Sequence, residues 1–121
     1  MAFRRVVLQP MIRVSAAMTQ ETRFAVRTTG WKSGQAFINV TENGSTAATT
    51  LDLRGATGLN FSDTMGAGTF WPSLGTVSIG IAGTGQFRIT PSPIQDYMRW
   101  HIGSFTGNPM SFEVVLFLYD A

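Results

Sequence analysis

The segment SFEVVLFLYDA, residues 111–121, decides the fold class and raises a question about function. Its residues alternate as in a β-strand, where successive side chains point to opposite faces of a sheet. One face is fully apolar and holds Phe112, Val114, Leu116 and Leu118. The other face holds Glu113, Val115, Phe117 and Tyr119. Because only the glutamate suits water, the second face also needs a cover. We expect another protein chain to provide it, with the segment 55–75 of the same chain as the alternative.

The same alternation recurs along the chain and predicts an all-β protein. Alternating segments lie at 3–9, 22–29, 34–41, 49–55, 75–83, 85–91 and 96–105. The best helical pattern, at 15–20, is one turn at most. Turn signals separate the strands, namely Asn43-Gly44 within TENGST (41–46), AGTGQ (82–86) and TGNPM (106–110). The Asn-Gly pair predicts a hairpin. We expect an antiparallel β-sandwich of jelly-roll type or, alternatively, of immunoglobulin-like type, with a closed barrel as a third arrangement.

The composition indicates one domain that buries surface against partners. The chain has 121 residues, of which only 13% are charged, and no cysteine. Interface cores are depleted in charge, so a low charged fraction favours an oligomer or an assembly. The apolar run near the start is broken by Gln9 and Pro10, so it is too short for the apolar region of a signal peptide. We therefore expect a chain made in the cytoplasm, with no signal peptide and no membrane partner.

Residues 1–14 form either an extended N-terminal arm or a first strand, ahead of one sandwich domain at 15–121. This segment has apolar residues on both faces, and Pro10 divides it into two extended pieces. Residues 1–32 carry six basic residues and one acid, whereas residues 33–121 carry three basic residues and six acids. Extended arms can add to the sheet edge of a neighbour. We expect Arg4, Arg5 and Arg13 to dock onto acidic surfaces of such a neighbour.

No sequence motif indicates a particular reaction, a metal site or a cofactor site. The single histidine, His101, lies beside Arg99 on the polar face of a predicted strand, and the acids are scattered singly. Metal sites need clustered ligands, and general acid–base catalysis needs a positioned titratable group. We therefore expect no enzyme activity and no cofactor. Nucleic acid is a poor fit, because six cations over 32 residues are sparse for a dedicated binder.

A carbohydrate is the strongest small-ligand alternative. The segment 55–75 is long and glycine-rich, and Phe70 and Trp71 near its end are candidate contacts for a ligand or a partner. Long loops of this kind are often functional. Trp31 is a second candidate stacking platform. Trp100 is flanked by apolar residues and is expected in the core.

The ending YMRWHIGSFTGNPMSFEVVLFLYDA (97–121), within a short, cysteine-free, weakly charged all-β chain, resembles the decoration (cement) proteins of tailed-phage capsids. The resemblance implies a structural virion protein that forms a homotrimer or other closed oligomer and binds a capsid protein, or another virion protein, through many contacts. A minor tail or fibre-base protein and a glycan-binding module are the alternatives. The resemblance assigns no residue. The strand pattern itself gives the candidate interface residues Arg4, Arg5, Val7, Arg13, Phe117 and Tyr119.

Overall fold

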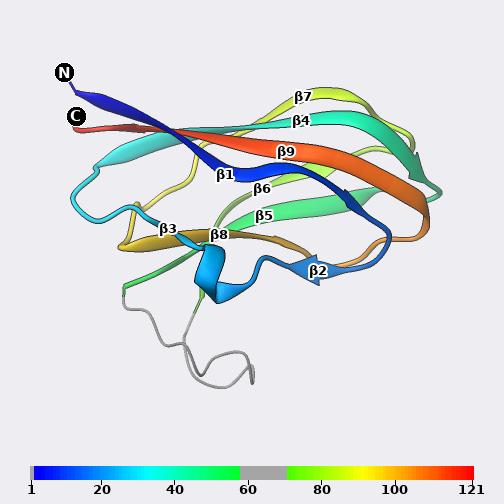
Figure 1. Cartoon of the computed structure of the whole chain (residues 1–121), viewed down its shortest axis with the longest axis horizontal. Coiled ribbons are helices and arrows are strands. Elements are labelled where there is room, and N and C mark those ends of the chain that lie inside the picture. The colour runs from blue at the N-terminus through cyan, green and yellow to red at the C-terminus, as the bar shows by residue number, and fades with distance from the viewer. Residues whose placement is uncertain (1, 58–70) are drawn as a thin grey trace.

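The protein folds into two antiparallel sheets that pack face to face (Figure 1), in a computed structural model that describes residues 2–57 and 71–121. The strands are β1 (Phe3–Val14), β2 (Met18–Thr19), β3 (Val26–Arg27), β4 (Ser33–Ser45), β5 (Thr49–Ala56), β6 (Ser73–Ile79), β7 (Gly85–Ile89), β8 (Tyr97–Ile102) and β9 (Gly107–Tyr119). A short 3-10 helix, η1 (Thr22–Phe24), precedes β3. The all-β prediction is therefore confirmed.

The strand order is that of a jelly roll. The first sheet, sheet A, has the order β1-β9-β4-β7, and the second, sheet B, has the order β2-β8-β5-β6. Most consecutive strands lie in opposite sheets, and β5 and β6 are the consecutive strands that pair directly with each other. Two four-strand orders interleaved in this way define a jelly-roll sandwich rather than an immunoglobulin-like one.

The strands β2 and β3 share one position at the edge of sheet B. Both pair with β8, with Met18 opposite Ile102 and Val26 opposite Met98. The chain leaves the ladder between them and forms η1. The predicted strand at 22–29 is therefore wrong except at Val26–Arg27. The predicted turn at 15–20 is also wrong, because its end forms β2.

The core lies between the sheets and is built from the inward positions of each strand. On β9 these positions are the four predicted apolar residues, all of which are 0% exposed. The Trp100 ring of β8 packs edge-on against Phe112 of β9, with ring centroids 5.1 Å apart and planes at 87°. Edge-to-face packing adds to the gain from burial.

Two glutamines connect the sheets beside this aromatic pair. The indole Nε1 of Trp100 donates to Oε1 of Gln9 on β1 at 2.9 Å. Gln20 donates from Nε2 to the carbonyl of Leu8 at 2.7 Å, and its own backbone amide donates to the Trp100 carbonyl at 3.0 Å. Buried polar groups must find such partners, so the glutamines fix how β1 sits over sheet B.

The predicted hairpin at Asn43-Gly44 is wrong, because β4 and β5 belong to different sheets. Both residues lie inside β4, at a register shift opposite β9. The Asn43 side chain accepts from the Ser45 amide at 2.9 Å and donates to the Gly83 carbonyl at 2.8 Å. Asn43 therefore lies at a register shift of β4, and its side chain links this strand to the β6–β7 turn instead of forming a hairpin turn.

Residues 3–14 form the first strand rather than a free arm. Nearly the whole of β1 pairs antiparallel with β9, which makes β1 an edge of sheet A and β9 a central strand between β1 and β4. Of the two places that a mostly apolar last strand could take, the centre of a sheet or its open edge, the structure shows the centre. Within the described residues, no helix has the length and apolar character needed to cross a membrane.

Candidate functional site

The outward face of sheet A is the candidate site, and its residues lie in rows that cross the strands. The first row runs from Gln86 on β7 through Asn39 on β4 to Glu113 on β9. Gln86 Nε2 donates to Asn39 Oδ1 at 3.2 Å, and Asn39 Nδ2 donates to Glu113 Oε1 at 3.0 Å. This chain of planar groups fixes all three side chains on a rigid sheet.

The second row is apolar except for an arginine at its β7 end. Val115 of β9 lies between Phe37 of β4 and Val7 of β1, and Arg88 of β7 is on the far side of Phe37. These neighbours leave Val115 only 6% exposed. Most of the covering of this part of the second β9 face is therefore supplied by adjacent strands of the same chain.

The third row places Phe117 of β9 between Gln35 of β4 and Arg5 of β1. The rings of Phe37 and Phe117 pack edge-to-face, with centroids 5.7 Å apart and planes at 83°. Both rings are half-buried. A fourth row at the end of the sheet brings Tyr119 between Ser33 and Phe3.

These rows surround a shallow, open depression of about 390 Å³. The residues that line it are Arg5, Phe37, Asn39, Gln86, Glu113, Val115 and Phe117. Small-molecule sites usually combine apolar and aromatic walls with a few fixed polar groups. The depression has this composition, and its polar groups carry both signs of charge.

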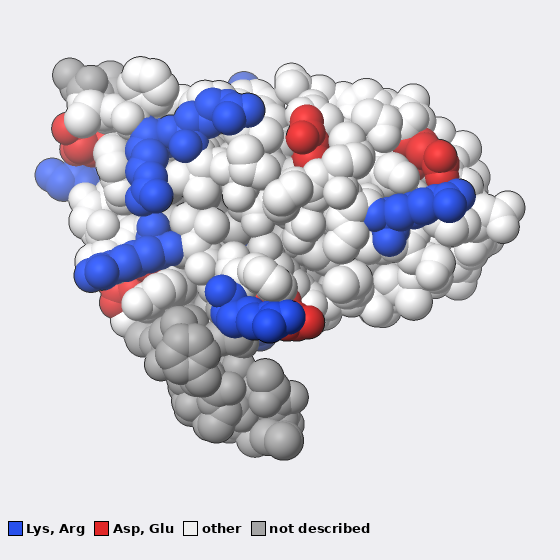
Figure 2. Space-filling view, viewed as in Figure 1, with Lys and Arg blue, Asp and Glu red and all other residues white. Residues whose placement is uncertain are grey.

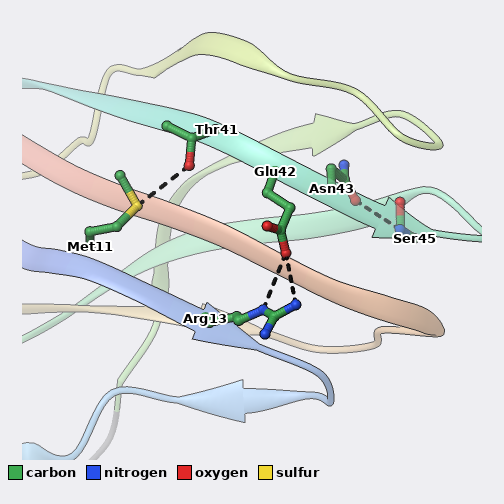
Figure 3. A network of polar contacts seen from close by, with 6 residues as sticks. All are labelled: Met11, Arg13, Thr41, Glu42, Asn43 and Ser45. Carbon is green, nitrogen blue, oxygen red and sulfur yellow. Dashed lines mark hydrogen bonds and ion pairs between the residues drawn. The ribbon is translucent and has the colours of Figure 1, made fainter.

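Four of the predicted interface residues meet on this face, namely Arg5, Val7, Phe117 and Tyr119. Arg4 does not, because it pairs with the inward-facing Leu118 and so belongs to the opposite side of β1. Arg13 lies farther along the same outward face, where it forms an ion pair with Glu42 at 3.1 Å across β9 (Figure 3). Arg13 is therefore already paired within the chain.

The predicted loop aromatics do not form part of this site. Phe70 lies outside the described residues. Trp71 is only 8% exposed, and the Arg99 guanidinium lies 4.1 Å from its ring centroid. The exposed stacking ring expected at Trp71 is therefore not found. Trp31 is partly buried against the core, and Trp100 is fully buried, as expected.

The histidine lies on the outer face of sheet B, away from the depression. His101 Nδ1 is 2.6 Å from the Thr19 hydroxyl, and Asp52 lies opposite His101 on β5. Burial, reinforced by the Arg54 charge and opposed by Asp52, lowers the pKa of His101 below its ordinary value of 6.5. Asp52 is paired with Arg54 at 3.0 Å. Among the described residues, no three His, Cys, Asp or Glu side chains cluster as a metal site would need.

Sequence reasoning missed Phe37, Asn39, Gln86 and the role of Glu113 as a row partner. Each occupies an outward position in a strand that the alternation does predict. The missing information was the register between strands, since a row forms only when these positions come opposite one another.

Comparison with known proteins places the chain in no described family. No protein-family model matches it, and no curated protein matches it. Among solved structures it is similar to the CBM22-1–GH10 modules of the Clostridium thermocellum endo-1,4-β-D-xylanase 10B in complex with xylohexaose, with a TM-score of 0.49 and 9% identity. That alignment covers 98% of this chain and 26% of the xylanase chain, so the protein spans about a quarter of that chain's length.

Proposed function

We propose that the protein is a non-catalytic binding module that holds a carbohydrate chain on the outward face of sheet A. The observation that carries this proposal is the arrangement of polar and aromatic rows around the depression. Gln86, Asn39 and Glu113 line the depression as a hydrogen-bonded polar row, and Phe37 and Phe117 line it as a pair of packed rings.

The chemistry of the rows suits a sugar. Amide and carboxylate groups supply both donors and acceptors for hydroxyl groups. Glu113 uses Oε1 for Asn39, and its Oε2 makes no hydrogen bond to another described residue. The Arg5 guanidinium is exposed and likewise has no ion-pair partner in the described part of the chain. Aromatic rings supply an apolar body against which the C–H faces of a pyranose pack.

Most of the polar and aromatic side chains of the site contact one another within the chain. Phe37, Asn39, Glu113 and Phe117 project from the two longest strands of the sheet, β4 and β9, and hydrogen bonds or ring packing hold these four side chains in place. A preorganised surface loses little conformational entropy on binding.

The test is affinity electrophoresis of the protein through gels that contain single soluble polysaccharides. At least one polysaccharide should retard the protein, and Asn39→Ala, which breaks the polar row, should remove the retardation. Thr76→Ala on the exposed outer face of sheet B is the matched control and should migrate like the wild type. The proposal fails if no polysaccharide in a broad panel retards the wild-type protein, or if Asn39→Ala is retarded equally.

A second candidate function is a structural subunit of a virion that self-associates and binds a capsid or tail protein. The observation that favours it is the row of exposed apolar side chains on β1, with Phe3 62%, Val7 41% and Met11 49% exposed. Interfaces are enriched in aromatic residues, methionine and arginine, all of which this strand contains. Light scattering over a range of concentrations separates the two candidates, because a stable closed oligomer supports the subunit and a monomer at high concentration argues against it.

A further inference from the structure

The outer edge of β1 is an open sheet edge in its first half. Within the described residues β1 pairs with β9 on one side and with no strand on the other. Residues Phe3 to Val7 pair with Tyr119 to Val115 in unbroken register. This regular stretch, which we call the free edge, is the part of the strand able to template another strand.

One hydrogen bond shows which backbone amides and carbonyls of the free edge point toward β9 and which point away from it. The Ala2 carbonyl accepts from the Asp120 amide at 3.3 Å, so Ala2 directs its polar groups toward β9. Hydrogen-bonding direction alternates along an antiparallel pair. Phe3, Arg5 and Val7 therefore direct their amides and carbonyls away from β9, into solvent. The Tyr119 carbonyl agrees with this pattern, because it turns toward β4 and accepts from Lys32 at 3.0 Å.

The second half of β1 is protected against strand addition. Its register shifts twice, between Val7 and Gln9 and again between Gln9 and Ile12. Pro10 has no amide hydrogen to offer, and the Leu8 carbonyl is already bonded to Gln20. Bulges and proline are devices that natural edges use against pairing. Because these devices lie only in the second half of β1, the free edge is the part of β1 that can pair with an added strand.

A socket lies where the free edge ends. It has a volume of about 390 Å³ and opens between β1 and the β2–η1 segment of sheet B. Val7 and Ile12 contribute from β1, and Met18 and Phe24, which are 39% and 56% exposed, contribute from the other side. The socket has room for an apolar side chain carried by an added strand.

The positive charge of β1 favours an acidic partner at the free edge. The strand carries three arginines and no acid. Arg13 is paired with Glu42, whereas Arg4 and Arg5 are exposed and form no ion pair with another described residue. Basic side chains gather over the half of the molecule that holds the two chain ends (Figure 2). A second copy added antiparallel about Arg5 would set two arginines directly opposite each other, which is destabilising.

We propose that the free edge receives an extended acidic segment of another protein as an added β-strand, which places one apolar side chain in the socket. Main-chain hydrogen bonds to Phe3, Arg5 and Val7 supply affinity, and Arg4 and Arg5 select acidic side chains. The proposed carbohydrate site uses side chains on the sheet face rather than the strand edge, and Arg5 is the residue that the two sites share.

The test measures fluorescence anisotropy of a labelled valine-rich peptide with two adjacent glutamates at its centre, added to the full-length protein. Adjacent residues of a strand point to opposite faces, so the two glutamates can meet Arg4 and Arg5, which lie on opposite sides of β1. The peptide should bind, more weakly as salt rises, and a valine–lysine peptide should not bind. Arg4→Glu combined with Arg5→Glu should weaken binding by about tenfold or more, since each reversal replaces an attraction by a repulsion. Arg88→Glu, an exposed reversal on β7, is the matched control and should leave the affinity unchanged.

Peptides N-methylated at alternate residues test the strand geometry without altering the protein. Methylation on the set of amides that faces β1 should abolish binding, and methylation on the other set should not. The proposal is overturned if the glutamate peptide does not bind at low salt, if both methylated sets bind equally, or if Arg88→Glu weakens binding as much as the β1 reversals. Self-association of the wild type that the β1 reversals abolish would also overturn it, because the occupant would then be a second copy.

Discussion

Replacing Gln9 by leucine tests how the two sheets are held in register. Gln9 Oε1 is the acceptor for the Trp100 indole N–H at 2.9 Å, and Trp100 is 0% exposed. Leucine fills similar space but leaves this buried donor without a partner, at a cost of about 1–3 kcal/mol. For a domain of this size we expect the midpoint of thermal unfolding to fall by about 4–12 °C. Urea unfolding followed by far-ultraviolet circular dichroism measures the free energy of unfolding.

A double-mutant cycle separates the hydrogen bond from general packing. Trp100→Phe removes the donor and loses packing against Phe112, so it is destabilising by itself. Adding Gln9→Leu to Trp100→Phe should then cost little, which gives a coupling energy of about 1–2 kcal/mol. The reasoning is refuted if Gln9→Leu alone is within about 0.5 kcal/mol of the wild type, or if the two changes are additive. Either result would mean that water entering from the adjacent socket replaces the glutamine oxygen.

Three further predictions concern stability. The pKa of His101 is lowered in the folded protein, mainly by burial, so the unfolded chain binds more protons than the folded one just below pH 6.5. The free energy of unfolding should therefore rise with pH in this range. His101→Gln should flatten the rise when unfolding is measured from pH 5 upward. Gly107 has φ +109°, and a Cβ added there would lie 2.6 Å from the Gly44 carbonyl oxygen, so Gly107→Ala should lower the free energy of unfolding by about 2 kcal/mol or more. A Cβ added at Gly80 meets nothing within 4 Å, so Gly80→Ala should be near neutral. Equal effects of the two variants in urea unfolding would contradict this. Arg13→Ala breaks a solvent-exposed ion pair and should change the free energy of unfolding by less than about 1 kcal/mol, and a larger loss would mean that the pair organises the β1–β9 ladder.

Much of the fold follows from local alternation. The segment 34–41 lies within β4, 49–55 within β5, and 111–119 within β9, each with its predicted apolar residues buried. Alternation fails at 22–29, where Phe24 and Val26 fit a strand pattern but only Val26 joins β8. The difference is nonlocal, because the Gln20 side chain bonds across to Leu8 and the chain then turns out of the ladder.

The candidate site was predicted only in part. Phe117 could be chosen because it is an apolar residue on a face expected to be wet, and Arg5 could be chosen because it carries a charge without a partner nearby in the sequence. Their neighbours Phe37 and Asn39 carry no such signal, since one aromatic and one amide in a strand are ordinary. They matter because the register sets Phe37 beside Phe117 and Asn39 beside Glu113.

Alternation along the chain was enough to predict an antiparallel sandwich, with a closed barrel as an alternative, and to predict the core-facing residues of β4, β5 and β9 and the apolar outer side of the last strand. Three features came from the three-dimensional arrangement: β1 pairs with β9 within the chain, β9 is central, and the first half of β1 is an open edge. The physical reason is that a period of two fixes the face on which each side chain lies but not the partner of the strand. Partner choice depends on which nonlocal pairing buries both β9 edges and satisfies the Trp100 indole through Gln9.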